Sequence, residues 1–283
     1  MAATPGTPRA RALSAALREA RKASGFGVRE LARRLSLGHV QISQWESGHR
    51  VPRLEAVAMI LAVIGTPRDE RERILGLARN VNEPNWLTVG VNGIPQQLAG
   101  VVECERTASA ITAWSPLLIP GLLQTVDYVR VIQQNGGRLS ASDVELRVML
   151  KASRSEVISR RIAPVRFTAL IGEWALREPI GPPAVMVDQL NHLLAMATRP
   201  NVTLRVVPRH VGWHPGLMGP FMLFDFPDAP PVLYLEHHSS GAFIPTEHDV
   251  AAYRKAMAWL GELALGPDES AALIATLIEE AAT

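Results

Sequence analysis

The chain contains 283 residues, of which 47% are hydrophobic and 20% are charged, and it is long enough for two domains with separate cores. It has no run of about 18 apolar residues, so we expect no membrane span, and its first residues lack the apolar stretch of a secretory signal. Cys104 is the single cysteine, which excludes an internal disulfide and agrees with a reducing cytoplasm.

Charge is divided unevenly along the chain, although the formal net charge of the whole is only +2. Residues 1–80 contain 14 Lys and Arg residues and 7 Asp and Glu residues, a net charge of +7. Residues 81–283 contain 15 and 20 such residues, a net charge of −5. A basic segment is typical of a nucleic-acid-binding module, whereas DNA phosphates would repel the acidic remainder.

Five helices are predicted in the basic segment, which we assign to one domain over residues 1–80. The first covers residues 9–24, and we expect its basic side chains to point outward: Arg9, Arg11, Arg18, Arg21 and Lys22. The other four are expected at residues 28–35, 38–46, 54–64 and 67–79. The helix that begins at Leu54 is nearly all apolar, so we expect it to be buried.

The helices at 28–35 and 38–46, joined by a tight turn, form the central motif of the sequence. Their apolar residues recur at helical spacing, and we expect them to form the core of the motif: Leu31, Ala32, Leu35, Ile42 and Trp45. The second helix leaves a different set outside: His39, Val40, Gln41, Ser43 and Gln44. None of these is acidic, and all except the valine can form hydrogen bonds.

A short helix with amide and hydroxyl side chains on its free face suits the major groove of DNA. Gln can read adenine there through two hydrogen bonds, and Ser can donate to a base edge or a phosphate. The alternative is an ordinary helical hairpin whose polar face is solvated.

The motif resembles the Cro/cI-type helix-turn-helix of the XRE class of repressors. The matching elements are Glu30-Leu31-Ala32 in the first helix, Ile42-Ser43-Gln44-Trp45-Glu46 in the second, and Gly48-His49-Arg50-Val51-Pro52 after it. The docking geometry of that class implies that the bases are read by His39, Val40, Gln41 and Gln44. It also implies that phosphates are held by Ser43, Arg50 and Arg53.

Three positions depart from the pattern of that class. Ser36 stands where the class usually has Gly at positive φ, a strain of about 1 kcal/mol unless Gly38 absorbs the turn. Val28 replaces a Gln that contacts the DNA backbone, which puts that contact in doubt. Trp45 replaces a smaller aliphatic residue and still fits a buried role.

The remainder is predicted as a linker over residues 81–100, rich in Asn, Gly and Pro, and a second domain over residues 101–283. Helices are expected at residues 101–113, through Tyr128 and Ile132, and at 142–160, 184–198, 247–265 and 268–281. Strands are expected at residues 165–171, 202–207, 221–226 and 232–235. The predicted fold is therefore multidomain, α and α+β: a five-helix helix-turn-helix bundle followed by a mixed α/β domain.

The second domain resembles WhiJ-like actinobacterial regulators with an antitoxin-like C-terminal domain. The shared segments, in order, are IPGLLQT at 119–125, GEWAL at 172–176, DQL at 188–190, VVP at 206–208, GPF at 219–221 and YLE at 234–236. The resemblance implies a transcription regulator, often encoded beside a small partner protein. We take as the candidate ligand or partner region Trp114, Ile119, Pro120, Gly121, Leu122, Gln124 and Arg154. Ser155 stands where the family usually has Gln, so ligand or partner binding can differ there.

Histidines of the second domain raise the alternative of a metal site. His210 and His214 lie in a Gly/Pro-rich loop, and Glu236-His237-His238 ends a predicted strand. The spacing lacks the two helical histidines one turn apart that make a zinc motif informative, so we expect no metal, cofactor or catalytic site. Four aromatic residues are expected in the core: Trp114, Trp174, Trp213 and Phe221.

Three hypotheses follow, and double-stranded DNA is the partner in each. The first is a non-enzymatic, homodimeric transcription regulator, located on the nucleoid in the cytoplasm and modulated through its C-terminal domain by a small-molecule effector. The second is an antitoxin-like adaptor that binds a small protein encoded by a neighbouring gene and regulates its own operon. The third is an enzyme fused to a DNA-binding domain, which predicts a bound metal.

Overall fold

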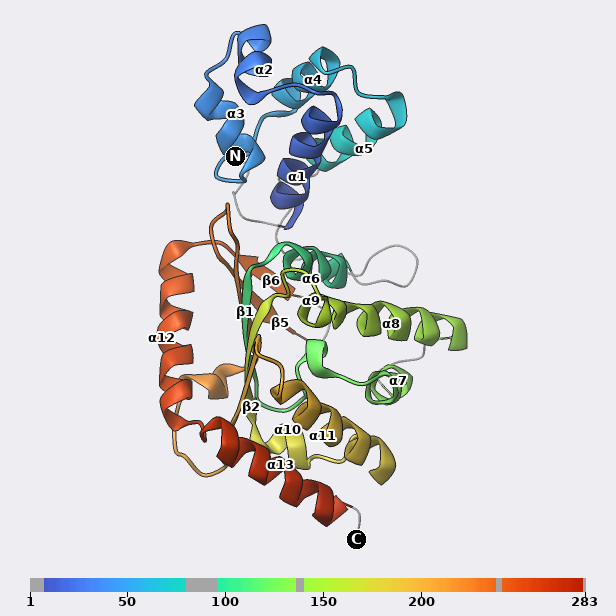
Figure 1. Cartoon of the computed structure of the whole chain (residues 1–283), viewed down its shortest axis with the longest axis vertical. Coiled ribbons are helices and arrows are strands. Elements are labelled where there is room, and N and C mark those ends of the chain that lie inside the picture. The colour runs from blue at the N-terminus through green and yellow to red at the C-terminus, as the bar shows by residue number, and fades with distance from the viewer. Residues whose placement is uncertain (1–7, 80–95, 136–139, 238–240, 282–283) are drawn as a thin grey trace.

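The computed structural model describes residues 8–79, 96–135, 140–237 and 241–281. A helical N-terminal domain is stacked on a larger domain built around one sheet (Figure 1). Most of the predicted linker, residues 81–100, lies outside the described residues.

The N-terminal domain consists of five helices around one apolar core. They are α1 (Pro8–Ala23), α2 (Val28–Leu35), α3 (His39–Glu46), α4 (Leu54–Val63) and α5 (Arg68–Arg79). The largest core side chains include Leu13, Leu17, Leu31, Ile42, Leu61 and Ile74. The expectation that α4 is buried throughout is wrong, because Leu54, its first residue, lies outside the core and is 36% exposed.

The C-terminal domain is organised around a six-stranded mixed sheet. The strands are β1 (Ala110–Ser115), β2 (Arg166–Gly172), β3 (Val202–Val207), β4 (Phe221–Asp225), β5 (Val232–Glu236) and β6 (Gly241–Ile244). Their order across the sheet is β3-β2-β1-β4-β5-β6. The first three strands of the chain pair in parallel, and the pairs β1–β4, β4–β5 and β5–β6 are antiparallel.

The helix predicted over residues 101–113 is wrong at its C-terminal end. Helix α6 (Gln96–Thr107) ends earlier, and β1 occupies the centre of the sheet. Ile111 and Trp114 lie on opposite sides of β1 in two different cores, so both faces of this strand are covered. A short apolar run that is buried on both sides cannot be told from a buried helix by periodicity. Strand β6 was not predicted either.

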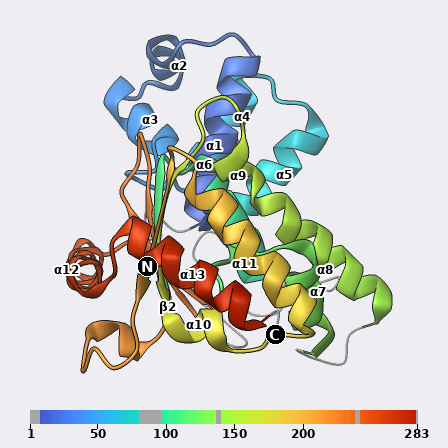
Figure 2. The ribbon, with the colours of Figure 1, turned by 60° about the horizontal axis from the view of Figure 1, so that its bottom comes forward.

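Helices cover the two faces of the sheet unequally (Figures 1 and 2). Helix α12 (Glu247–Leu263) and the short 3-10 helix η3 (Pro215–Met218) lie on one face, over a core that contains Leu170, Leu233 and Leu260. The opposite face carries α6, α9 (Glu156–Ser159), α10 (Glu173–Arg177), α11 (Pro183–Ala197) and α13 (Pro267–Ala281). Outside this layer, α7 (Val126–Asn135) and α8 (Ala141–Arg154) pack on each other. Among the described helices, none is both long enough and apolar enough to span a bilayer.

Candidate nucleic-acid interface

The turn between α2 and α3 has its left-handed residue at Ser36. Ser36 has φ 55° and ψ 38° and is the C-cap of α2. The amide N–H of Leu37 donates to the carbonyl of Ala32 at 2.9 Å and closes the turn. Gly38 has φ −71° and precedes α3 in extended backbone, so it does not absorb the turn. The strain of about 1 kcal/mol for a non-glycine residue in this conformation therefore falls on Ser36.

Two apolar residues fix the orientation of α3 on the domain. Ile42 and Trp45 are buried in the N-terminal core together with Leu31 and Ala32. Leu35, the fifth residue expected in the motif core, is only partly buried and packs against the same core. One face of α3 is thus committed to packing, and the other face is left to solvent.

The free face of α3 holds all five side chains that the sequence places outside. His39, Val40 and Ser43 are exposed, and Gln41 and Gln44 are partly exposed. Val40 is 55% exposed, as single apolar side chains on protein surfaces often are. None of the five side chains forms a hydrogen bond to another described residue, so all can meet a ligand.

Two of the residues expected to hold phosphates follow α3 directly. Arg50 and Arg53 are exposed, and neither forms an ion pair with another described residue. Their segment is anchored, because the N–H of Arg50 donates to the carbonyl of Gln44 at 3.1 Å and Pro52 is buried. Guanidinium groups in this position can approach phosphates without first breaking an ion pair.

A buried ion pair ties the C-terminal end of α3 to α1. Arg21, expected to point outward, instead lies inside: its Nε donates to Glu46 Oε1 at 2.7 Å and its Nη2 to Glu46 Oε2 at 2.8 Å. Its Nη1 donates to the carbonyl of Phe26 at 2.7 Å. The Arg21 and Glu46 side chains are 10% and 9% exposed, and the hydrogen bonds to Glu46 raise the pKa of Arg21. This pair holds the C-terminal end of α3 on α1.

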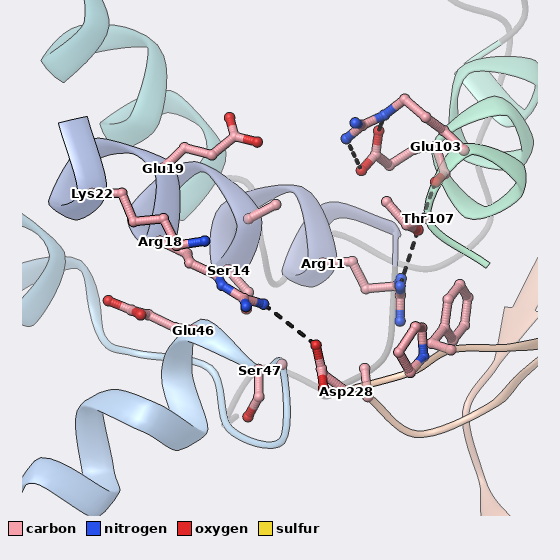
Figure 3. A pocket seen from close by; sticks show the side chains of 16 residues that line it. Arg11, Ser14, Arg18, Glu19, Lys22, Glu46, Ser47, Glu103, Thr107 and Asp228 are labelled. Atoms are coloured by element: carbon pink, nitrogen blue, oxygen red, sulfur yellow. Dashed lines mark hydrogen bonds and ion pairs between the residues drawn. The ribbon is translucent and has the colours of Figure 1, made fainter. Parts of the chain in front are cut away.

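Arg11 of α1 also departs from the outward expectation, because it reaches the C-terminal domain (Figure 3). Its Nη2 donates to Thr107 Oγ1 on α6 at 3.1 Å, and its guanidinium carbon lies 3.1 Å from the centroid of the Phe226 ring. Burial lowers the pKa of Arg11. Stacking and hydrogen bonding at one side chain hold α1 against the larger domain.

The loop after β4 contacts the N-terminal domain at a second place. Arg18 Nη1 lies 3.5 Å from Asp228 Oδ2, and Figure 3 shows this pair below α1. A Cβ atom added to Gly48, just after α3, would lie 4.0 Å from the Cβ of Ala229. A cavity of about 340 Å³ separates the two domains around these contacts. Residues 226–229 therefore contact α1 and lie beside the end of α3.

The candidate ligand or partner region maps to a second cavity, of about 300 Å³, within the C-terminal domain. Six of the seven expected residues line it: Trp114, Ile119, Pro120, Gly121, Gln124 and Arg154. Leu122 is instead buried in the main core. Gln189 fixes the loop, since its Nε2 donates to the carbonyl of Leu123 at 2.7 Å and its Oε1 accepts from the N–H of Thr125 at 2.8 Å.

The histidines considered as metal ligands are His210, His214, His237 and His238. His214 is buried and packs edge-on against Trp114, with ring centroids 5.8 Å apart, and burial lowers its pKa. His238 lies outside the described residues. Within the described part of the chain, no three His, Cys, Asp or Glu side chains gather at a common point. Burial raises the pKa of the Cys104 thiol to about 12, so this thiol is protonated at neutral pH.

Two of the aromatic residues expected in the core are on the surface. Trp174 is 50% exposed and Trp213 is 66% exposed, whereas Trp114 and Phe221 are buried as expected. Arg209 lies over the Trp174 ring at 5.2 Å, and Trp213 packs edge-on against Trp259. The rings of Trp174 and Trp213 are therefore partly covered by neighbouring side chains on the surface and are not part of the core.

Sequence reasoning missed the charged partners in the second cavity. Glu105 accepts from Arg154 Nε at 2.9 Å and from Arg154 Nη2 at 2.6 Å, across 49 positions of the sequence. Lys151 lines the same cavity one helical turn before Arg154. The spacing of the two basic residues on one helix face was a signal available in the sequence, whereas the pairing with Glu105 was not.

Comparison with known families first defines the class of the N-terminal domain. Residues 12–74 match a Helix-turn-helix domain, which suggests DNA binding and makes DNA the expected partner. Residues 98–276 match the Domain of unknown function (DUF5753). Because that match covers more than half of the chain, the protein belongs to the DUF5753 family. No curated protein and no solved structure matches the chain.

Proposed function

We propose that this chain is a sequence-specific transcription regulator that binds double-stranded DNA as a homodimer, with α3 in the major groove. The observation that carries the proposal is the free face of α3, which is non-acidic and rich in hydrogen-bonding groups. It is flanked by Arg50 and Arg53, which form no ion pair within the described part of the chain. The likeness to Cro/cI-type repressors and to WhiJ-like regulators supports it. No catalytic step and no metal are part of this function, so stoichiometric metal in purified protein would argue against it.

The proposal assigns separate roles to two groups of residues. The base-reading group consists of His39, Val40, Gln41 and Gln44. The phosphate-holding group consists of Ser43, Arg50 and Arg53. Changes in the first group should alter sequence preference, and changes in the second should weaken binding to all sequences alike.

A dimer is proposed because one helix-turn-helix makes few contacts. Two copies that read half-sites about 34 Å apart, one turn of DNA, would supply the specificity of an operator. The C-terminal domain supplies the dimer surface or the site of modulation. The contacts of Arg11 and Arg18 with Thr107 and Asp228 support such modulation, because they link α1 to that domain, and α1 holds the end of α3 through the Arg21–Glu46 pair.

The test is selection of binding sites from random duplex DNA with the full-length protein, followed by gel shifts. Gln41→Ala and Gln44→Ala should change the preferred sequence, and Gln134→Ala on the exposed side of α7 is the matched control. A palindromic preferred site together with a dimeric mass by light scattering would support the proposal. An unchanged preference in both α3 variants would contradict the base-reading role.

An adaptor that captures a small protein is the second candidate. It is favoured by a group of exposed apolar residues beside α12, in which Trp213 and Trp259 pack edge-on at 5.4 Å: Trp213, Leu217, Met218 and Trp259. Exposed apolar clusters of this kind mark protein interaction sites. Co-expression with the product of a neighbouring gene distinguishes the two functions, because only the adaptor forms a stable complex that Trp213→Ser abolishes.

A further inference from the structure

The cavity beside the IPGLLQT loop has the size of a small-molecule site, about 300 Å³. Its wall is formed by the loop after β1, by α8, and by residues of β4 and β5. Part of the wall is rigid, because Trp114 is buried and its Nε1 donates to the carbonyl of Gly216 at 2.8 Å. The shape of the cavity is therefore determined by packed helices, strands and a hydrogen-bonded loop.

Arg154 presents an unused donor at this cavity. Glu105 occupies its Nε and Nη2, and Nη1 has no hydrogen bond to any described residue. A Cβ atom on Gly121 would lie 3.0 Å from Nη1, so the guanidinium rests directly on the loop backbone where a larger residue would crowd it. The pair with Glu105 holds the guanidinium in a fixed orientation, as a prearranged donor requires.

Lys151 adds a second cation on the same side of α8. Its ammonium group forms no hydrogen bond and no ion pair with a described residue. Burial lowers the pKa of Lys151 and the charge of Arg154 lowers it further, while Glu236 acts in the opposite direction. A partly buried and unpaired ammonium is unfavourable, and an anion placed between Lys151 and Arg154 would offset that cost.

The rest of the cavity wall is largely apolar. Leu117 and Leu118 lie at it with exposed side chains, and Met222 is partly buried beside it. Polar groups interrupt this surface, because Ser115, Tyr234 and Glu236 also line the cavity. Gln124 Oε1 is buried without a partner among the described residues, although its Nε2 donates to the carbonyl of Ile119 at 2.7 Å. Among the lining residues Glu236 is the one carboxylate, so the two cations of α8 exceed the negative charge at the cavity and suit a ligand with one anionic end.

We propose that this cavity binds a small organic anion, with its carboxylate, phosphate or sulfonate between Lys151 Nζ and Arg154 Nη1 and its apolar body against Leu117, Leu118 and Met222. Nothing in the family assignment names such a ligand. The role of this anion as an effector rests on the proposed DNA-binding function, but binding of the anion can be tested without DNA.

The chain has only three lysines, Lys22, Lys151 and Lys255, which allows a direct test. Reductive methylation with ¹³C-formaldehyde gives one NMR signal for each lysine and one for the N-terminal amine, and Lys→Arg variants assign them. Full-length protein is titrated with decanoate, decyl phosphate and 8-anilinonaphthalene-1-sulfonate. We expect saturable movement of the Lys151 signal with at least one of these anions, with Lys22 and Lys255 unchanged, and no movement with neutral decanol.

Two results of this titration would overturn the inference. The first is a Lys151 signal that stays in place with all three anions. The second is equal movement of all lysine signals, or equal movement with decanol, because either would indicate unspecific adsorption.

Matched variants then test the geometry by calorimetry with the anion that binds. Lys151→Met keeps the apolar stem and should weaken binding at least 10-fold, a change of about 1.4 kcal/mol, while Lys255→Met on the exposed side of α12 should not. Leu118→Asp and Leu118→Asn both remove an apolar contact, and the aspartate adds a carboxylate at the cavity, so Leu118→Asp should weaken binding more than Leu118→Asn does. If Lys151→Met and Leu118→Asp both bind the anion with the affinity of the unsubstituted protein, this cavity is excluded as the site.

The same titrations separate this inference from the proposed function. A protein that binds an anion at Lys151 but has no affinity for DNA would remove the proposed function alone. A protein that binds DNA specifically but leaves Lys151 unaffected by every anion would remove this inference alone.

Discussion

The two domains each contain a buried Arg–Glu pair, and the pairs differ in one hydrogen bond. In both, the arginine donates through Nε and Nη2 to the two carboxylate oxygens of a glutamate. Arg21 also donates from Nη1 to the Phe26 carbonyl. Arg154 has no such third partner among the described residues, and its Nη1 lies at a cavity.

This difference separates a structural pair from a pair that can serve a ligand. Every donor group of Arg21 is used inside the domain, so the pair with Glu46 can only hold α3 on α1. Arg154 is held as firmly by Glu105 but keeps one donor free, and the unpaired Lys151 lies one turn away. Burial and hydrogen-bond number together, and not the ion pair itself, indicate which arginine is available for binding.

The largest effect is expected from Arg154→Met. The Arg154 and Glu105 side chains are 8% and 0% exposed, so the substitution leaves a fully buried carboxylate without its cation. We expect the free energy of unfolding to fall by about 3–5 kcal/mol, measured by urea denaturation followed by circular dichroism. Glu105→Leu/Arg154→Met should recover most of this loss, because the double variant removes both charges. A single variant that loses less than about 1 kcal/mol would contradict the burial of this pair.

Arg21→Met should have a smaller effect on stability, about 2 kcal/mol, because Glu46 keeps some contact with water. It should also weaken DNA binding, since the end of α3 loses its anchor on α1. Arg73→Met breaks an exposed pair with Glu70 in the same domain and is the control, with an expected loss below about 1 kcal/mol. Equal losses in the two variants would mean that Arg21 is not a structural anchor.

The same contrast explains what the sequence could and could not predict. The helix-turn-helix was predictable because its elements are local: four of its five core residues are buried where helical spacing places them, and its polar face is free. The positions of Arg11 and Arg21 were not, because their partners lie in other helices or in the other domain. A prediction made from one helix alone places every arginine on the exposed face. Only the tertiary contacts of the fold show which arginines are buried.

In the C-terminal domain, strands that show a clear local pattern of apolar residues were predicted from the sequence. Strands that lack such a pattern were missed. Strand β3 was predicted at its observed bounds, whereas β1 was taken for the end of a helix because it is covered on both faces. Four residues of the IPGLLQT segment line the cavity: Ile119, Pro120, Gly121 and Gln124. Glu105 was not, because its role exists only once α6 and α8 meet in the fold.

Arg50→Ala and Arg53→Ala test the arginines that, unlike both buried ones, have no partner at all in the described structure. Each should weaken binding to specific and random duplex DNA by a similar factor, of order 10-fold at low salt, because a phosphate contact carries no sequence information. The slope of log affinity against log salt should fall by about 0.9 for each variant in fluorescence anisotropy titrations. Arg161→Ala, an exposed arginine of the C-terminal domain, should leave the slope unchanged.

The smallest effect is expected from Ser36→Gly, which tests whether the turn of the helix-turn-helix carries backbone strain at its left-handed residue. Glycine adopts φ 55° without a Cβ penalty, so we expect a gain of up to about 1 kcal/mol in the free energy of unfolding, reduced by the added freedom of the unfolded chain. Gly38→Ala is the matched control: Gly38 has negative φ and a Cβ there meets no atom within 4 Å, so its stability should stay within about 0.5 kcal/mol. Thermal and urea denaturation of both variants measure the difference. A loss of stability in both Ser36→Gly and Gly38→Ala would mean that the left-handed residue of the turn is Gly38 and not Ser36.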